Sequence, residues 1–197
     1  MILPVKLYSK VKRDSIRSHL RPYSIHGRRS TTINHAFASA IAPNDDYDDE
    51  RLRQAIRDLG QDPDQDLMCA YCEVNSAETW DHVHGLVTGK RYSGHGHLIG
   101  NLLPCCRNCN SSKGNKDWRV FLRTQISDDA RFAHKLAQLE RFFDIHQGQP
   151  LGQDDIERIC PEEMGELKVI RDQILQLMRD ADVVADRVRT QLRTRSE

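Results

Sequence analysis

The chain has 197 residues, with 29 Lys and Arg against 29 Asp and Glu, so its formal net charge is zero. A chain of this length buries one good core, or one small domain with an appendage, and zero net charge does not by itself favour a nucleic-acid partner. No stretch approaches the ~20 apolar residues that span a membrane. The N-terminal residues lack an apolar run long enough for a signal peptide, so we expect a cytoplasmic protein.

Charge is distributed unevenly along the chain. Residues 1–40 contain eight Lys or Arg and one Asp, and residues 80–125 contain seven basic and two acidic residues. Between them, residues 44–66 contain nine Asp or Glu and three Arg. Two basic regions separated by an acidic one are compatible with binding to phosphates. The alternative for the N-terminal arm is an ordinary solvated surface.

Three helices are expected before the first cysteine. The first spans about residues 10–20, and the second spans 31–42 with Ser30 as its N-cap. The third begins at the acidic run 44–46, which suits the positive end of a helix dipole, and it ends at Gly60. This region, residues 1–66, is the first predicted part of the chain.

Two Cys-x-x-Cys pairs follow, and outside a secreted protein such pairs indicate a metal site more than disulfides. The paired residues are Cys69, Cys72, Cys106 and Cys109. Four thiolates complete a tetrahedral Zn²⁺ site at ~2.3 Å per bond and leave no open position, so this zinc is predicted to be structural. Cys105 is the alternative ligand to Cys106, and the Cys-x-x-Cys spacing favours Cys106. Cys160 is expected to be a lone thiol.

The segment between the pairs carries most of the residues that suggest chemistry. They are Asp81, His82, His84, His95, His97 and Asn101, and Asn110 follows the last cysteine. We expect strands at 79–84 and 98–104, joined by a glycine-rich loop over 85–97, with a helix opening at 106–110. A structural metal that clamps both ends of a polar, histidine-rich loop is typical of a built active site.

This pattern resembles the zinc-containing branch of the HNH endonucleases over roughly residues 67–120. The matching residues are Asp81-His82-Val83, then Asn101-Leu102, then Cys106-x-x-Cys109-Asn110-x-x-Lys113-Gly114. The resemblance implies a ββα-metal core, two strands and a helix around a catalytic divalent ion. Asn110 stands where many members of the family carry His, which changes the atom that meets the metal.

The resemblance also implies a role for each matching residue. His82 is the expected general base, and Asp81 and Asn110 are the expected oxygen ligands of Mg²⁺, Mn²⁺ or a similar ion. Asn101 is expected to hold the loop and orient His82, and Lys113 to contact phosphate. Asp81 and His82 point to opposite sides of a strand, so a turn or twist has to bring them to one site.

Other residues of this segment have weaker assignments. Lys90, Arg91, His95 and His97 are expected to contact nucleic acid, the alternative being a mobile loop with incidental charges. His84 is expected to be a surface histidine more than a metal ligand. Trp80 is expected in the core more than as a platform for stacking bases.

The rest of the chain is predicted to be helical. Short helices are expected at 118–122 and 154–158, and a longer one at 128–146 with Ser127 as its cap. From Pro161 a helix of about 30 residues carries a heptad stripe, which would pair with the 128–146 helix or with a second copy of the chain. The stripe comprises Leu167, Ile170, Ile174, Leu177, Ala181, Val184 and Val188.

Together these features predict an α+β, mostly helical fold in which residues 67–125 form an HNH core with four-cysteine zinc, and 126–197 a helical region. The expected function is a metal-dependent DNA endonuclease, with RNA as the alternative substrate. Two other hypotheses stay open: a non-catalytic zinc-stabilised module that binds nucleic acid, and a nuclease subunit of a larger complex. A homodimer or a protein partner would use the C-terminal heptad helix.

Overall fold

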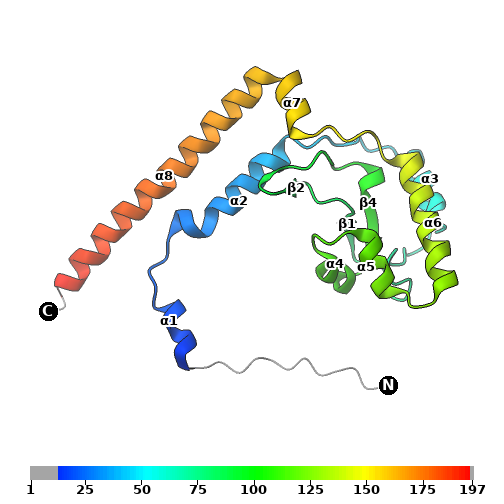
Figure 1. Ribbon diagram of the computed structural model, residues 1–197, viewed down its shortest axis with the longest axis horizontal. Helices are drawn as coiled ribbons and strands as arrows, with labels where there is room; N and C mark the ends of the chain where they lie inside the picture. Colours follow the sequence, from blue (N-terminus) through cyan, green and yellow to red (C-terminus); the bar gives the residue numbers. More distant parts are fainter. Residues whose placement is uncertain (1–12, 196–197) are drawn as a thin grey trace. The chain divides into compact units, whose positions relative to one another are not determined.

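The computed structural model describes residues 13–195, and within them the fold is α+β and mostly helical, as predicted (Figure 1). The chain divides into two compact units. The larger comprises residues 31–173, and the smaller comprises residues 13–30 together with 174–195. No helix of this described part is long and apolar enough to cross a membrane.

The centre of the larger unit is a pair of strands followed directly by a helix. Strand β1 (Thr79–His82) pairs antiparallel with β4 (Leu102–Cys105), so that Asp81 lies opposite Leu103. The helix α4 (Arg107–Lys113) begins two residues after β4, with Cys106 as its N-cap residue. The second strand is shorter than the sequence predicts, because a turn of 3-10 helix precedes it.

The connection between β1 and β4 contains a small hairpin and this 3-10 turn. Strands β2 (Val87–Thr88) and β3 (Arg91–Tyr92) are joined by Gly89 and Lys90, whose φ angles of 58° and 71° are both positive. Two central residues with positive φ are the signature of a type I′ turn, which matches the twist of paired strands. The 3-10 turn η2 (Ile99–Asn101) then leads into β4.

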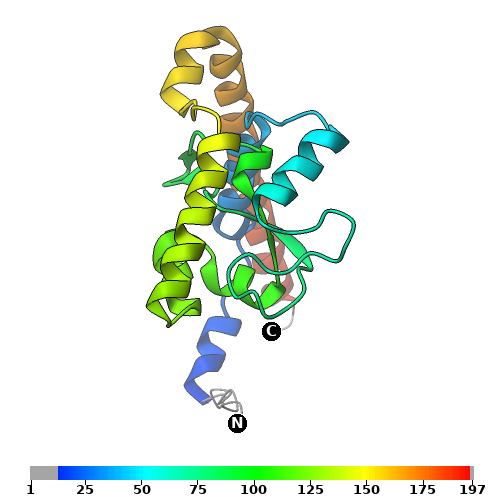
Figure 2. The ribbon, with the colours of Figure 1, turned by 90° about the vertical axis from the view of Figure 1, so that its right-hand side faces the viewer.

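Three helices of the larger unit form a packed group (Figures 1 and 2). They are α3 (Asp49–Asp58), α5 (Trp118–Gln125) and α6 (Asp129–His146), of which α3 and α5 each contact α6, and α3 and α6 contact the turn η2. Their buried side chains form one core with both cysteine pairs, and its largest members are Trp118, Tyr71, Phe142, Leu103, Leu122 and Leu139. The core therefore holds the metal-binding loop and the helices together.

Aspartates cap these helices, and two of the predicted caps were wrong. The Asp48 carboxylate accepts from Arg51 N, so α3 begins later than the acidic run at 44–46. The Asp128 carboxylate accepts from Arg131 N, so the cap of α6 is Asp128 and not Ser127. In each case the capping aspartate is the residue three positions before a backbone N–H that has no partner within the helix, and its carboxylate can reach that N–H.

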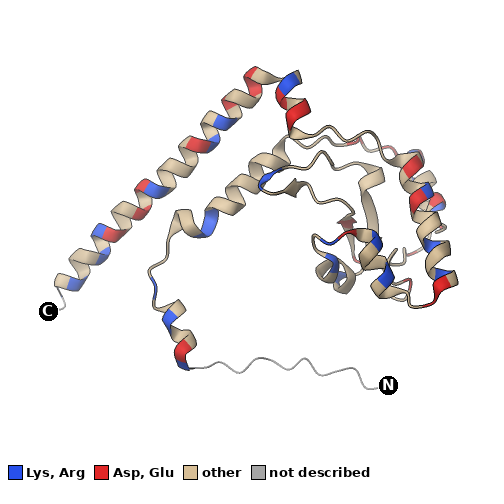
Figure 3. Cartoon of the chain, in the orientation of Figure 1, with Lys and Arg blue, Asp and Glu red and all other residues tan. Residues whose placement is uncertain are grey.

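Two helices follow α6, namely α7 (Gln153–Ile159) and α8 (Pro161–Thr194). The apolar side of α6 is buried at Leu139, Phe142 and Phe143, whereas no residue of α8 is buried. Acidic and basic side chains alternate along α8 between its apolar positions (Figure 3). Four residues of the predicted heptad stripe of α8 are exposed, namely Ile170, Leu177, Val184 and Val188, and the other three are partly buried.

The smaller unit contains η1 (Arg13–Ser15), α1 (Ile16–His19) and the start of α2 (Ile25–Ala40). The helix predicted for 31–42 in fact begins at Ile25, because Asp182 caps it. The Asp182 carboxylate accepts from Ile25 N at 2.6 Å, His26 N at 3.0 Å and the Ser24 hydroxyl at 2.8 Å. Of the helix predicted over 10–20, residues 10–12 lie outside the described part.

Candidate metal centre and adjoining histidine site

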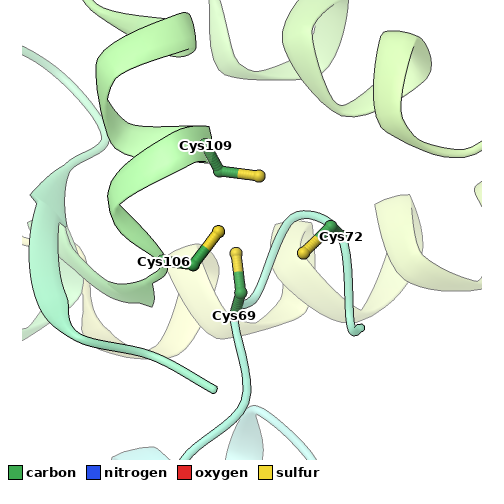
Figure 4. A group of neighbouring side chains, drawn as sticks. All are labelled: Cys69, Cys72, Cys106 and Cys109. Carbon is green, nitrogen blue, oxygen red and sulfur yellow. The ribbon is translucent and has the colours of Figure 1, made fainter. Parts of the chain in front are cut away.

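Four cysteines converge from the two predicted pairs. Cys69 and Cys72 come from the loop before β1, and Cys106 and Cys109 from the first turn of α4 (Figure 4). Their sulfur atoms all lie within 4.8 Å of one another. A tetrahedral zinc with bonds of ~2.3 Å separates its sulfurs by about 3.8 Å, so this group can hold a structural ion such as zinc.

The sulfur chemistry agrees with this geometry. A hydrogen bond with Cys105, opposed by burial and helped by backbone N–H groups, lowers the pKa of Cys69 to about 4. The same hydrogen bond and burial raise the pKa of Cys105. Cys105 is therefore a thiol beside the cluster, and Cys106 is the cysteine that belongs to it. Asn75 Nδ2 lies 3.8 Å from Cys72 Sγ and 3.9 Å from Cys106 Sγ, where it stabilises thiolate charge.

Side chains alternate along β1, and this separates Asp81 from His82. Asp81 points inward, where its Oδ2 accepts from the Tyr71 hydroxyl at 2.7 Å and lies 3.0 Å from Lys113 Nζ. His82 lies on the opposite face and is half-buried. Asp81 is buried whereas His82 is partly exposed, as the alternation of side chains along a strand predicts. The turn or twist that would bring both to one site stays a prediction.

Lys113 lies in the interior, with 1% of its surface exposed. Its ammonium contacts Asp81 and donates to the carbonyl oxygens of His82, at 3.0 Å, and Gly114, at 3.5 Å. The three oxygen partners of this buried ammonium all belong to the protein, and its charge fixes α4 against β1. The contact of Lys113 with phosphate stays a prediction.

Of the two residues expected to bind the catalytic ion, Asp81 already has a cationic partner within the protein. Asp81 and Asn110 offer the hard oxygen atoms that Mg²⁺ prefers, and Asn110 lies one turn before Lys113 on the same side of α4. Asp81 Oδ2, however, already has the Lys113 ammonium as its partner. A divalent ion on this oxygen therefore requires the ammonium to move away from it.

Four histidines form two pairs across the loop. His82 Nε2 lies 3.0 Å from His97 Nδ1, and the rings of His84 and His95 stack with their centres 4.2 Å apart. Each pair joins the segment that leaves β1 to the segment that returns toward β4. We call these four residues the histidine ladder.

Asn101 and Gly96 hold the ladder in place. Asn101 is buried, and its side-chain amide donates to the carbonyls of His84 and Gly96 and accepts from His84 N, at 2.9–3.0 Å. A Cβ on Gly96 would lie 2.0 Å from the Pro43 carbonyl oxygen, so the close approach of these two segments requires glycine. His97 N donates to the same carbonyl at 2.8 Å.

The surroundings lower the pKa of three histidines of the ladder, His82, His84 and His95. Burial, assisted by His97 and Lys113 and opposed by Asp81, lowers the pKa of His82. Burial and His95 lower the pKa of His84 to about 4, and burial lowers that of His95. A neutral imidazole keeps one nitrogen lone pair, so these side chains can accept protons at pH 7.

Comparison of the chain with protein-family models, with curated proteins and with solved structures finds no match. Of the resemblance to the HNH endonucleases, the structure shows the four-cysteine cluster that can hold a metal ion.

Two cavities flank the ladder, one on each side. A polar cavity of about 460 Å³ is lined by His84, His95 and the β2–β3 hairpin. A largely apolar cavity of about 280 Å³ is lined by His97 and Trp80. Trp80 was expected in the core but is 43% exposed, because it shares the outward face of β1 with His82. Because side chains alternate along a strand, the sequence alone could have indicated that Trp80 is exposed.

The basic residues of the hairpin turn lie elsewhere. Lys90 and Arg91 line a third cavity, of about 480 Å³, together with residues of α2, α7 and α8 that belong to the larger unit. The Arg91 guanidinium pairs with Asp154. The expected group of nucleic-acid contacts is thus divided, with His95 and His97 on the ladder and the two basic residues in a different cavity.

Proposed function

We propose that this protein is a metal-dependent endonuclease of the HNH type that hydrolyses phosphodiester bonds of DNA. The observation that carries the proposal is the contact of 3.0 Å between His82 Nε2 and His97 Nδ1, together with the burial that lowers the pKa of His82. The pair lies beside a cavity and is held on a frame that four cysteines clamp.

The proposal takes His82 Nε2–H as the donor in its contact with His97 Nδ1, which leaves His82 Nδ1 to accept the proton. One of the two nitrogens must carry the hydrogen, and with His82 Nε2–H as the donor its Nδ1 keeps a free lone pair. Nδ1 then takes a proton from the attacking water, and His97 stabilises the imidazolium that results. In this proposal His82 is the general base, His97 is a positioning residue, and Asn101 fixes the backbone between them.

The proposal includes a divalent ion, Mg²⁺ or Mn²⁺, that Asp81 and Asn110 would hold by oxygen atoms. When bound, such an ion supplies positive charge to the scissile phosphate and the leaving oxygen. Lys113 would have to release Asp81 Oδ2, from which its ammonium lies 3.0 Å away. The cysteine cluster would hold zinc and keep its structural role.

Plasmid cleavage tests this assignment. Purified protein is incubated with supercoiled DNA and Mg²⁺ or Mn²⁺, and wild type is compared with His82→Ala and with His134→Ala, a change at an exposed histidine of α6. Loss of the general base should lower the cleavage rate by about 10²- to 10⁴-fold. The His134 variant should cleave as wild type does. A wild type inactive on every DNA, or equal activity of the His82 variant, would overturn the proposal.

A second candidate function is a non-catalytic zinc-stabilised module that binds nucleic acid. The contact between Lys113 and Asp81 favours it, because a carboxylate that already has a buried cation has no need of a metal ion. Binding that weakens steeply with salt, without cleavage under any metal, would identify this function.

The partly exposed stripe of α8 gives a third element of the proposal, a partner that is a second copy of the chain or the rest of a larger complex. Sedimentation of the full chain at several concentrations, alone and with the products of neighbouring genes, distinguishes the two. A monomer under all conditions would remove this element and leave the nuclease assignment intact.

A further inference from the structure

The cavity that His97 lines is also lined by Trp80, an aromatic side chain that is not part of the buried core. Trp80 and His82 are two residues apart on the outward face of β1, a separation of about 7 Å along a strand. Trp80 is nevertheless 43% exposed, whereas Trp118, the other tryptophan of the chain, is 1% exposed. We call the space that Trp80 and His97 line the Trp80 cavity.

The volume and the apolar lining of the Trp80 cavity suit one planar aromatic ring of a ligand. Its volume is about 280 Å³, slightly less than cavities that hold a drug-sized molecule, which start at about 300 Å³. Its apolar floor comes from α3, η2, β4 and α6. The floor residues are Leu52, Ala55, Ile56, Leu59, Ile99, Leu102 and Phe142.

Three carboxylates, those of Asp45, Asp46 and Asp48, line the Trp80 cavity beside its apolar residues and favour some ligands over others. Asp45 pairs with Arg51 and accepts from Ile99 N, and Asp48 caps α3. Asp46 is exposed at the same rim. Negative charge at this mouth repels phosphate but accepts hydrogen bonds from an exocyclic amino group, as carboxylates do from cytosine N4.

We propose that the Trp80 cavity binds one unstacked nucleobase that carries an amino group, adenine, cytosine or guanine, next to the phosphate on which His82 acts. The base stacks on Trp80, and its amino group donates to the carboxylates at the rim. This inference rests on the proposed nuclease function and names its substrate class. A base inside a duplex cannot reach this position, so the preferred substrate is single-stranded, or has a base turned out of its stack.

Tryptophan fluorescence reads this contact directly, because Trp80 is accessible and Trp118 is not. Short single strands of dC or dA are titrated into the protein without added divalent ion, in parallel with dT strands and a blunt duplex. We expect dC and dA to quench the accessible tryptophan, with weaker binding of dT and none of the duplex in the same concentration range. Equal quenching by dT, or by the duplex, would overturn the proposal.

Three variants complete the test. Trp80→Leu should weaken binding of the dC strand by about 5- to 100-fold, the loss typical of one stacked base, without unfolding because the ring is exposed. Asp46→Asn should reduce the preference of dC over dT. Tyr23→Ala removes an exposed aromatic ring of the smaller unit and should bind as wild type does. Unchanged binding by Trp80→Leu, measured by anisotropy of labelled strands, would overturn the proposal.

The test of base binding can fail or succeed independently of the test of nuclease activity. His82→Ala should lose cleavage and keep the fluorescence quenching. Quenching without cleavage in wild type would refute the nuclease and keep the base-binding cavity. Cleavage without quenching would refute the cavity and keep the nuclease, and absence of both with every nucleic acid would refute the two together.

Discussion

The ammonium of Lys113 lies 3.0 Å from Asp81 Oδ2, with both side chains buried between α4 and β1. Removing one partner of a buried pair leaves an uncompensated charge, which costs about 3–5 kcal/mol. Lys113→Met should therefore destabilise the protein by that amount in urea unfolding. Lys116→Met, a change at an exposed lysine two residues before α5 begins, should unfold nearly as wild type does.

The double variant Lys113→Met, Asp81→Leu tests whether the charge itself is the cause. Replacing both partners by apolar groups removes the unpaired carboxylate, so the double variant should recover much of the stability lost in Lys113→Met. Stability of the double variant no better than that of the single one would show that packing, and not charge, accounts for the loss.

The cysteine cluster predicts a defined metal content. Purified protein should retain about one zinc per chain, because the four sulfurs form one closed site. Cys69→Ser and Cys106→Ser should lose this metal, whereas Cys105→Ser and Cys160→Ser should keep it. Mass spectrometry of the metal content measures this, and a Cys105 variant without zinc would contradict the assignment of Cys106.

Removal of the zinc should unfold the core of the larger unit, since both cysteine pairs belong to it. Circular dichroism after addition of a strong chelator tests this consequence. A protein whose helix signal and thermal transition survive complete loss of zinc would show that the hydrophobic core alone carries the fold.

The pairing of His82 with His97 predicts a particular kinetic pattern. His97→Ala should lower kcat about tenfold or more with little change in KM, because it removes the partner of the imidazolium and not a contact with substrate. His97→Gln should restore part of the rate, since its amide oxygen can accept from His82 Nε2. Equal losses in both variants would indicate a general structural role for this position.

The pH profile follows from the direction of the pKa shift at His82. Burial lowers that pKa below its usual 6.5, so most of the base is neutral at pH 7. Cleavage should therefore be constant around neutrality and fall only in acid, below pH 6.5. A rate that still rises between pH 7 and 8 would argue that another group is the base.

The cap that Asp182 forms on α2 predicts a pH-dependent contact in the smaller unit. Hydrogen bonds, first from Ile25 N, lower the pKa of Asp182 below its ordinary 3.8. A carboxylate with a lowered pKa in the folded state contributes stability above its unfolded pKa and loses it as pH falls through the folded value. Protection of the Ile25 and His26 amides from hydrogen exchange should therefore decrease below about pH 4. In Asp182→Ala, which removes the acceptor, it should be low at every pH.

The cysteine spacing and the hydrophobic periodicity were sufficient to predict the fold class, most helices and the cluster at residues 69–72 and 106–109. These features are local, because a Cys-x-x-Cys pair and a helical stripe are defined by neighbours in the chain. The same spacing correctly favoured Cys106 over Cys105. The start of α2 needed Asp182, which is 157 residues away from Ile25.

The site could be predicted in composition but not in arrangement. The spacing of Asn110 and Lys113 correctly indicates one side of α4, yet only the packed structure shows that this side faces inward. The pairing of His82 with His97 depends on where a loop returns, which no pattern in the sequence encodes. The catalytic roles of His82, Asp81, Asn101 and Asn110 stay predictions that the experiments above address.

The cysteine cluster has a consequence for how the protein could be altered. With a metal in place, residues 73–105 become a closed ring whose far tip is the β2–β3 turn, and a Cβ at Gly89 there would meet no atom within 4 Å. Lengthening a flexible loop costs only about 0.6 kcal/mol per doubling. The hairpin tip is therefore an insertion point, where a foreign peptide or a new specificity segment can be grafted while the two clamped ends keep their spacing.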